Sequence, residues 1–208
     1  MGGLKDRPGK PCRYGGGVMG KGRKGMLEEN GKRDYLRRLP DEYYRGLSFV
    51  HWSMTIAGRK TGWLTGDTHH EIREIMLHTL VRQKLTCPIY CLMPDHLHLL
   101  WIGLCEDSDQ KVAASFFRRY VGQVLRRANC SFQKQAYDNV LHEKDREQDA
   151  VIRLAYYISE NPLRAGLVSN VTEWKHSSSM MAGYPDMDWR AKDFAERFWK
   201  AYEMEAGK

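Results

Sequence analysis

One apolar stretch, YCLMPDHLHLLWIG at residues 90–103, constrains the fold of this chain more than any other. With the residues before it, this stretch forms two β-rich runs, residues 86–93 and 96–104, on either side of Pro94 and Asp95. Two such runs separated by a two-residue turn signal predict a tight hairpin. We therefore expect an antiparallel pair of largely buried strands in the middle of the fold.

The second run carries two histidines, His96 and His98, directly after the predicted turn. Alternate side chains of a strand point to the same face, so both imidazoles are expected to project together. Two neutral imidazoles side by side supply half of the ligands of a divalent metal site. The same spacing is also typical of histidines that are only solvated or hydrogen-bonded. A second motif elsewhere in the chain is therefore needed to distinguish a metal site from this alternative.

Apolar periodicity elsewhere predicts the other elements of an α+β domain. Strict alternation in YYRGLSFVHWSMTIAGRK places Val50 and Trp52 on one side of a strand and His51 and Ser53 on the other. Helical spacing or strand alternation predicts the remaining elements: helices at residues 68–84, 108–128 and 145–161, and a strand at 137–143. The order matches a ferredoxin-like α+β sandwich, with an antiparallel sheet and helices on one face.

The first predicted helix begins with a capping box formed by Thr68 and Glu71. Three histidines lie on this helix, His69, His70 and His78. We expect them to be surface residues and not ligands.

The helix predicted at residues 108–128 has an apolar and a basic face. Ser108 is the expected N-cap, and the expected apolar face consists of Ala113, Phe116, Phe117, Tyr120 and Val124. Steps of 100° per residue place the basic side chains opposite that face: Lys111, Arg118, Arg119 and Arg126. Such a row is typical of a solvated helix face, and it also suits contacts with phosphates.

The excess of positive charge lies in the N-terminal part of the chain. The net charge is +7, and residues 1–45 hold 12 Lys and Arg against 6 Asp and Glu, which leaves 21 against 20 for residues 46–208. Residues 1–40 carry ten of the nineteen glycines and little apolar content, so we expect a disordered arm in the free protein. A basic arm suits a polyanion partner or is simply a solvated tail.

The five cysteines are odd in number and irregularly spaced, which argues against a disulfide framework. Cys87 and Cys91 lie four residues apart in a strand, about 13 Å, too far to share one zinc ion. No run of about 18 apolar residues is present, and no apolar segment follows the first charges. We expect no contact with a membrane and a cytoplasmic location, associated with the nucleoid.

The second signal is AYYISENPLRAGLV at residues 155–168, in which Tyr157 precedes an Asn-Pro pair, Asn161 and Pro162, by four residues. Together with MPDHLH, this motif resembles the HUH single-tyrosine transposases, most closely the REP-associated tyrosine transposases. The resemblance covers about residues 44–179, and WKHSSSM is similar to the W-x-x-S-S element that follows the last helix in these proteins. The histidine and tyrosine motifs are specific to this family in combination, and neither is specific alone.

The resemblance implies a role for each matching residue. Tyr157 corresponds to the nucleophile, which forms a 5′-phosphotyrosine and leaves a free 3′-hydroxyl, and Asn161 corresponds to the amide that joins His96 and His98 at the metal. Residues i and i+4 of a helix share a face, whereas Tyr156 is turned about 100° from Tyr157. Two imidazoles, one amide oxygen and open positions suit Mg²⁺ or Mn²⁺.

The family acts on single-stranded DNA folded into hairpins, so the resemblance implies single-stranded DNA or DNA hairpins as the partner. Phosphate contacts are expected from the basic helix face and the arm: Arg118, Arg119, Arg126, Arg23, Lys24, Arg37 and Arg38. REP-associated members are thought to act as monomers, which we expect here, with a dimer as the alternative.

We expect three parts: the arm at residues 1–40, the transposase-like domain at 41–180, and a C-terminal helical extension at 181–208. The helix of the extension is expected to pack on the body through three aromatic residues, Phe194, Phe198 and Trp199.

Two other functions fit the same residues. A DNA hairpin-binding protein that has lost its chemistry would keep the fold and the basic face. A metal-dependent nuclease that uses water would keep the histidines, with Tyr157 as a structural residue only.

Overall fold

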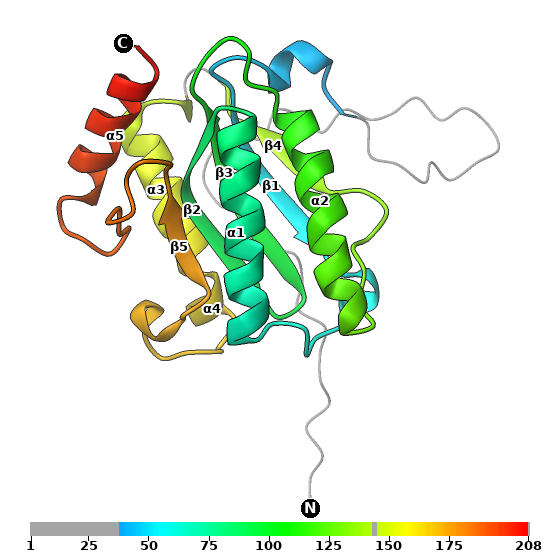
Figure 1. The fold of residues 1–208 in the computed structure, drawn as a ribbon. Coiled ribbons are helices and arrows are strands. Elements are labelled where there is room, and N and C mark those ends of the chain that lie inside the picture. Colours follow the sequence, from blue (N-terminus) through cyan, green and yellow to red (C-terminus); the bar gives the residue numbers. More distant parts are fainter. Residues whose placement is uncertain (1–37, 143–144, 208) are drawn as a thin grey trace, which may run out of the picture. The chain divides into compact units, whose positions relative to one another are not determined.

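The computed structural model describes residues 38–142 and 145–207, which lie in one compact unit, Tyr35–Lys208 (Figure 1). The expected arm therefore lies outside the described residues, apart from residues 38–40. The elements are η1 (Asp41–Tyr44), β1 (Phe49–Thr55), η2 (Ala57–Arg59), α1 (Gly66–Arg82), β2 (Leu85–Met93), β3 (His96–Gly103), α2 (Gln110–Arg127), β4 (Tyr137–Val140), α3 (Gln148–Ser159), α4 (Asn161–Arg164), η4 (Val171–Glu173), β5 (Ser177–Met180) and α5 (Phe194–Glu205).

The described strands form one sheet in the order β4-β1-β3-β2-β5, and every neighbouring pair is antiparallel. The first four strands confirm the α+β fold class, because the βαββαβ motif brings β1 and β3 together in the middle of the sheet. The predicted hairpin is the β2–β3 pair, in which Met93 lies opposite His96. β5 is an additional edge strand beside β2, which the sequence did not predict.

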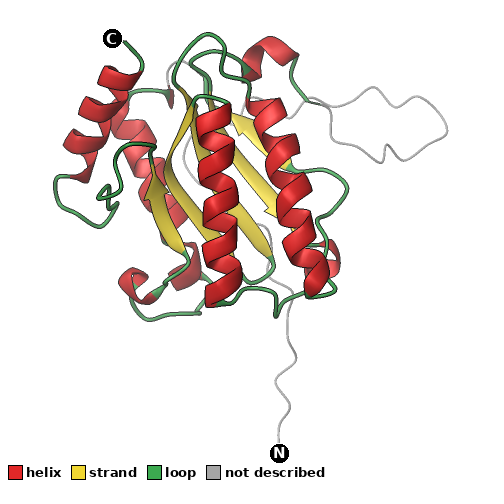
Figure 2. Ribbon diagram, viewed as in Figure 1, coloured by secondary structure: helices red, strands yellow, loops and turns green. Residues whose placement is uncertain are grey.

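Helices cover both faces of this sheet (Figure 2). α1 and α2 pack on one face, as expected, whereas α3 and α5 pack on the other, so the expectation of helices on one face holds only for the first pair. Alternate side chains of β1 point to opposite faces of the sheet. Val50, Trp52 and Met54 belong to the core under α1 and α2, and Phe49 belongs to the core under α3 and α5.

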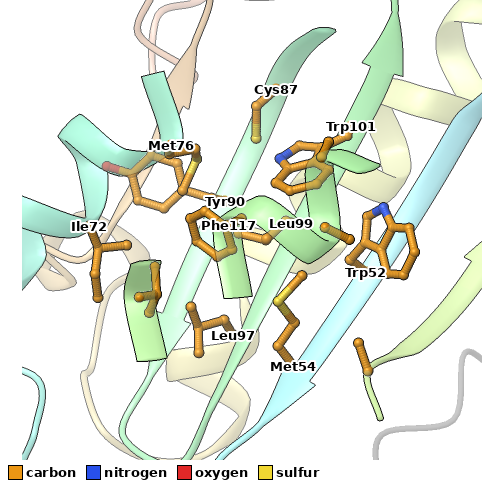
Figure 3. Packing of buried hydrophobic residues seen from close by; sticks show 14 of the residues in the cluster. Trp52, Met54, Ile72, Met76, Cys87, Tyr90, Leu97, Leu99, Trp101 and Phe117 are labelled. Atoms are coloured by element: carbon orange, nitrogen blue, oxygen red, sulfur yellow. The ribbon is translucent and has the colours of Figure 1, made fainter. Parts of the chain in front are cut away.

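The core under α1 and α2 is rich in large aromatic and sulfur-containing side chains (Figure 3). Trp101 packs edge-on against Phe117, with ring centroids 5.7 Å apart and planes at 89°. Trp52 lies on the other side of Trp101, at 6.3 Å. Fully buried aromatic side chains of this kind stabilise a fold strongly, so this layer holds the sheet rigid beneath any site on the opposite face.

The second core fixes α3 against β2. Val151, Ala155 and Ile158 of α3 are buried with Cys91 and Met93 of β2. The aromatic residues expected to anchor the C-terminal helix are buried in the same cluster: Phe194, Phe198 and Trp199. This layer places α3 on the face of the sheet toward which His96 and His98 point.

Two helix starts differ from the sequence expectation. α1 is capped by Thr65, whose hydroxyl accepts from Thr68 N, while Thr65 N donates to the Thr68 hydroxyl, so the capping box begins three residues earlier. α2 is capped by Asp109 and not by Ser108, because the Asp109 carboxylate accepts from the backbone nitrogens of Lys111 and Val112.

The buried face of α2 matches the expected one in part, because Ala113, Phe117 and Val124 are buried as predicted. Ala114, Val121 and Leu125 are buried, whereas Phe116 is half-buried and Tyr120 is 37% exposed. These last two rings instead pack against each other beside the core, with centroids 4.5 Å apart. Neighbouring apolar stripes of one helix have the same period, so periodicity alone does not select which stripe faces the sheet.

Gly103, at the end of β3, lies where the chain has no room for a side chain. A Cβ at this position would stand 1.9 Å from the carbonyl oxygen of Gly46. The close approach is held by hydrogen bonds on both sides, from Gly103 N to Ser48 O and from Gly46 N to Ser108 O, each 3.0 Å long. Only glycine fits between these two backbone segments.

We predict that Gly103→Ala destabilises the fold by about 1–3 kcal/mol or more, because the backbone has to shift to relieve the overlap. Urea unfolding measures the difference. Gly66→Ala is the matched control, since a Cβ at Gly66 meets nothing within 4 Å. Equal unfolding free energies for Gly103→Ala and the wild type would contradict the packing described here.

His69 on α1 is not a surface residue, contrary to the sequence expectation. Its Nε2 lies 3.0 Å from the Tyr90 hydroxyl, which also accepts from Arg73, and its ring lies 4.9 Å from that of His176. Burial, together with the charges of His176 and Arg73, lowers the pKa of His69 to about 4. His69 is therefore neutral in the folded protein at neutral pH.

This lowered pKa predicts acid sensitivity. In the unfolded chain His69 binds a proton near its ordinary pKa of 6.5, whereas the folded chain does not until about pH 4. The free energy of unfolding should therefore fall as the pH drops from about 6.5 to 4. His69→Gln should make this fall smaller in urea unfolding at several pH values, and His70→Gln, at an exposed neighbour, should not. Parallel curves for His69→Gln and the wild type would refute the assignment.

Candidate functional site

The two histidines of β3 meet at their outer ring nitrogens. His96 Nε2 lies 3.0 Å from His98 Nε2, and the two rings stand at 88° with centroids 4.7 Å apart. Both side chains are half-buried on the face of the sheet that α3 covers. The predicted pairing of the imidazoles is thus present, with the two nitrogens aimed at one another.

Asp95, the last residue of the turn, contacts the Nδ1 side of the His96 ring. Its carboxylate accepts from His96 Nδ1 at 2.6 Å and from Arg59 at 2.8 Å. Burial raises the pKa of Asp95, but the hydrogen bonds from His96 and Arg59 outweigh it, so the pKa is lowered overall. An ionised carboxylate only accepts, so it fixes the His96 proton on Nδ1 and leaves the Nε2 lone pair free.

His98 has two partners at its inner nitrogen. Ser53 Oγ lies 2.9 Å and His51 Nε2 lies 3.0 Å from His98 Nδ1, both from the neighbouring strand β1. Burial lowers the pKa of His98 well below its usual value, helped by His51 and His96. Burial also lowers the pKa of His51 to about 4. His51 and His98 are therefore neutral at neutral pH, the form of imidazole that binds metals.

The separation of the two Nε2 atoms fits a divalent ion. Two nitrogens, each about 2.1 Å from one ion and at right angles to each other, lie about 3.0 Å apart, which matches His96 and His98. Among residues 38–142 and 145–207, no group of three or more His, Cys, Asp or Glu could hold a metal. Two imidazoles would thus leave the other positions to an amide, water or substrate oxygens, an arrangement that suits Mg²⁺ or Mn²⁺.

The cysteines of β2 do not add ligands. Cys87 is buried in the core under α1 and α2, and Cys91 in the core under α3 and α5, because the pairing of β2 with β3 shifts register between Thr86 and Ile89. Burial raises the pKa of the Cys91 thiol to about 12 and that of Cys87 still higher. Both are thiols and free of disulfides, as expected.

Tyr157 lies on α3 and is half-buried, whereas its neighbour Tyr156 is 41% exposed. Arg164 covers the ring of Tyr157, with the guanidinium carbon 4.0 Å from the ring centroid. The same guanidinium donates to the carbonyl oxygen of Tyr157 and to Glu160, at 2.7 Å for the latter. The charge of Arg164 also contributes to the lowered pKa of His98, after burial, His51 and His96.

Asn161 is buried at the start of α4, directly before Pro162. The helix predicted at residues 145–161 is shorter in the structure: α3 spans Gln148–Ser159, and Asn161 and Pro162 begin α4, so Tyr157 and Asn161 lie on different helices. The amide nitrogen of Asn161 donates to Ile158 O at 2.9 Å, which leaves the amide oxygen as the group for a ligand role. Within the part of the chain that the structure describes, no hydrogen bond joins Asn161 to His96 or His98.

The predicted DNA-contacting arginines lie across the sheet from the histidines or outside the described residues. Arg118 donates to the Gln133 carbonyl and stacks on Phe132 at 4.8 Å, and Arg38 pairs with Asp138 at 3.3 Å. Arg119 and Arg126 are exposed on α2. The remaining three lie outside the described residues: Arg23, Lys24 and Arg37.

Four residues of the site were not proposed from the sequence: His51, Ser53, Asp95 and Arg164. Alternation already placed His51 and Ser53 on one face of β1, and Asp95 stands beside His96 in MPDH, so these three could have been proposed. Nothing local in the sequence shows that Arg164 folds back over Tyr157.

No protein family model and no curated protein matches this chain. Among solved structures, a REP-associated tyrosine transposase bound to a REP hairpin is 19% identical, with a TM-score of 0.56 over 69% of this chain and 81% of that chain. A bacterial tRNA(His) guanylyltransferase-like protein in complex with GTP is 12% identical, with a TM-score of 0.41 over 82% and 92%. The first likeness shows that the chain has the fold of that transposase.

No described helix combines the length and the apolar character needed to cross a membrane.

Proposed function

We propose that this protein is a metal-dependent single-strand DNA endonuclease and strand transferase, with His96 and His98 as metal ligands and Tyr157 as the nucleophile. The observation that carries the proposal is the convergence of two imidazole nitrogens at 3.0 Å, on the same face of the sheet as the helix that holds Tyr157. The fold shared with a REP-associated tyrosine transposase supports the reaction class.

A phosphodiester resists attack because its oxygens are negatively charged and its leaving group is poor. A divalent cation bound to the phosphate oxygens would offset their negative charge and orient the phosphate. His96 and His98 would hold this ion, with the amide oxygen of Asn161 as a third ligand. Asp95, which fixes the tautomer of His96, would keep that imidazole ready to bind.

Tyr157 would attack the phosphorus through its phenolic oxygen. The new bond joins this oxygen to phosphorus, the bond from phosphorus to the 3′-oxygen breaks, and the proton lost by the phenol is balanced by one gained at the 3′-oxygen. The product is a 5′-phosphotyrosine with a free 3′-hydroxyl, which keeps the energy of the bond for rejoining.

Arg164 would act on both the nucleophile, Tyr157, and the phosphate that it attacks. Its guanidinium lies against the Tyr157 ring and close enough to His98 to lower the pKa of that residue. A positive charge in this position stabilises negative charge that develops on the phenolic oxygen and on a phosphate beside it. We infer that Arg164 fixes the orientation of Tyr157 toward the metal ligands.

The proposed substrate is single-stranded DNA that carries a hairpin, the ligand class of the structural neighbour. Exposed Arg119 and Arg126 would contact the DNA backbone only if it passes over α2, across the sheet from the histidines. Arg38 and Arg118 already contact Asp138 and the Gln133 carbonyl oxygen, respectively, so we propose that they contribute less to DNA affinity.

We predict that Tyr157→Phe abolishes a covalent adduct between the protein and DNA, because only the attacking oxygen is removed. The adduct is detected on a denaturing gel after incubation of the full chain with labelled single-stranded hairpin DNA and Mn²⁺. Tyr156→Phe is the matched control and should keep the adduct, since this neighbour is turned away along the helix.

The same gel separates the competing functions. Cleavage that persists in Tyr157→Phe would identify a nuclease that uses water. Binding of the hairpin by the wild type with neither cleavage nor adduct would identify a DNA-binding protein that has lost its chemistry. Either result would overturn the proposed reaction.

We predict that His96→Ala slows adduct formation at least about 100-fold, because the loss of a metal ligand removes several kcal/mol of stabilisation from the reacting phosphate. The Kd for hairpin DNA should change little, since most affinity comes from contacts with the DNA backbone. Single-turnover rates and a filter-binding assay measure the two effects. The control is His78→Ala, at an exposed position of α1. A loss of affinity as large as the loss of rate would contradict the assigned role.

A further inference from the structure

A third imidazole, that of His51, lies behind the proposed metal ligands. His51 Nε2 is 3.0 Å from His98 Nδ1, and the two ring centroids are 5.1 Å apart. Ser53 Oγ reaches the same nitrogen at 2.9 Å, because Ser53 is directly opposite His98 in the β1–β3 pair. Among the described residues, His98 is the hydrogen-bond partner that the structure gives His51.

The positions of the protons show why this contact matters. A metal ligand has to be a neutral imidazole, which carries one proton; in that form Asp95 holds the His96 proton on Nδ1, so His96 Nε2 accepts. For His98 Nε2 to make a hydrogen bond with it at 3.0 Å, His98 has to carry its own proton on Nε2. In that tautomer His98 Nδ1 is an acceptor, and it takes a proton from His51 Nε2 or from the Ser53 hydroxyl.

Binding a cation requires the opposite tautomer of His98. Its Nε2 then has to present a lone pair, so its proton moves to Nδ1 and needs an acceptor there. An imidazole and a hydroxyl are the two neutral side-chain groups that can either donate or accept through the same atom, depending on tautomer or rotation. His51 and Ser53 can therefore satisfy His98 Nδ1 in both states, which an aliphatic residue or a carboxylate could not.

We propose that His51, assisted by Ser53, is a positioning residue that holds His98 in the tautomer whose Nε2 binds the metal ion. The proposal rests on the proposed function, because it takes His96 and His98 as the metal ligands. It assigns to His51 for His98 the role that Asp95 has for His96, so that each ligand has its own partner behind it.

Titration of the full-length protein with Mn²⁺ alone, followed by electron paramagnetic resonance of the free ion, tests this role without any activity assay. His51→Leu fills similar space and removes both ring nitrogens, and we expect it to raise the Kd for Mn²⁺ about 10- to 100-fold. His51→Gln keeps a group that donates and accepts, and it should recover most of the affinity. His78→Ala is the control and should bind Mn²⁺ as the wild type does.

The outcomes separate this inference from the proposed function. If His98→Ala binds Mn²⁺ as tightly as the wild type, the histidines are not the metal site and the proposed function fails. If His98→Ala loses binding but folded His51→Leu does not, only the role of His51 is overturned.

A second measurement needs no variant and so covers the case in which His51→Leu does not fold. In ¹⁵N spectra of the imidazoles of the wild-type protein, saturating Mg²⁺ should move the His98 proton from Nε2 to Nδ1. A scalar coupling across the hydrogen bond between His98 Nδ1 and His51 Nε2, which lie 3.0 Å apart, should appear in the same state. A His98 proton on Nδ1 without this coupling would overturn the role of His51 alone, whereas a His98 that keeps its proton on Nε2 with the ion bound would overturn the proposed function.

Discussion

The contact between the outer nitrogens of His96 and His98 is the feature on which the proposed chemistry depends. Neutral imidazoles whose lone pairs converge repel each other, so a 3.0 Å approach has to be bridged by a proton or by a cation. Asp95 fixes the proton of one ring on the inner side, and His51 with Ser53 can do the same for the other. The His96–His98 pair can therefore exchange the proton that bridges the two nitrogens for a metal ion.

The fold brings these groups together through strand pairing and not through a loop. β3 lies between β1 and β2, so its histidines have β1 residues behind them and β2 beside them. β2 carries α3 on the same face, and α3 carries Tyr157. The large aromatic residues on the opposite face, with Trp101 under α2, keep the central strands from shifting. A site on paired strands is held more rigidly than one on a mobile segment.

The features that could be predicted from the sequence are those that depend on local geometry. Alternation in β3 places His96 and His98 on one face, and the apolar period predicts the helix that carries Tyr157, although this helix ends at Ser159 and not at Asn161. Features that depend on packing between distant segments could not be predicted. β5 is a short Ser-rich segment that forms a strand by pairing with β2, and Phe116 and Tyr120 of α2 pack on each other beside the core. Arg164, the last residue of α4, reaches the ring and the carbonyl oxygen of Tyr157 across the break between α3 and α4.

The most direct test of the account is a crystal structure of the Tyr157→Phe variant with Mn²⁺ and a single-stranded DNA hairpin, with the ion located by its anomalous scattering. The account predicts an anomalous peak within bonding distance of Nε2 of both His96 and His98 and of a phosphate oxygen, with the ring at position 157 facing that phosphate. A peak away from the two imidazoles, or a bound phosphate on the α2 side of the sheet with the imidazoles still in direct contact, would contradict it.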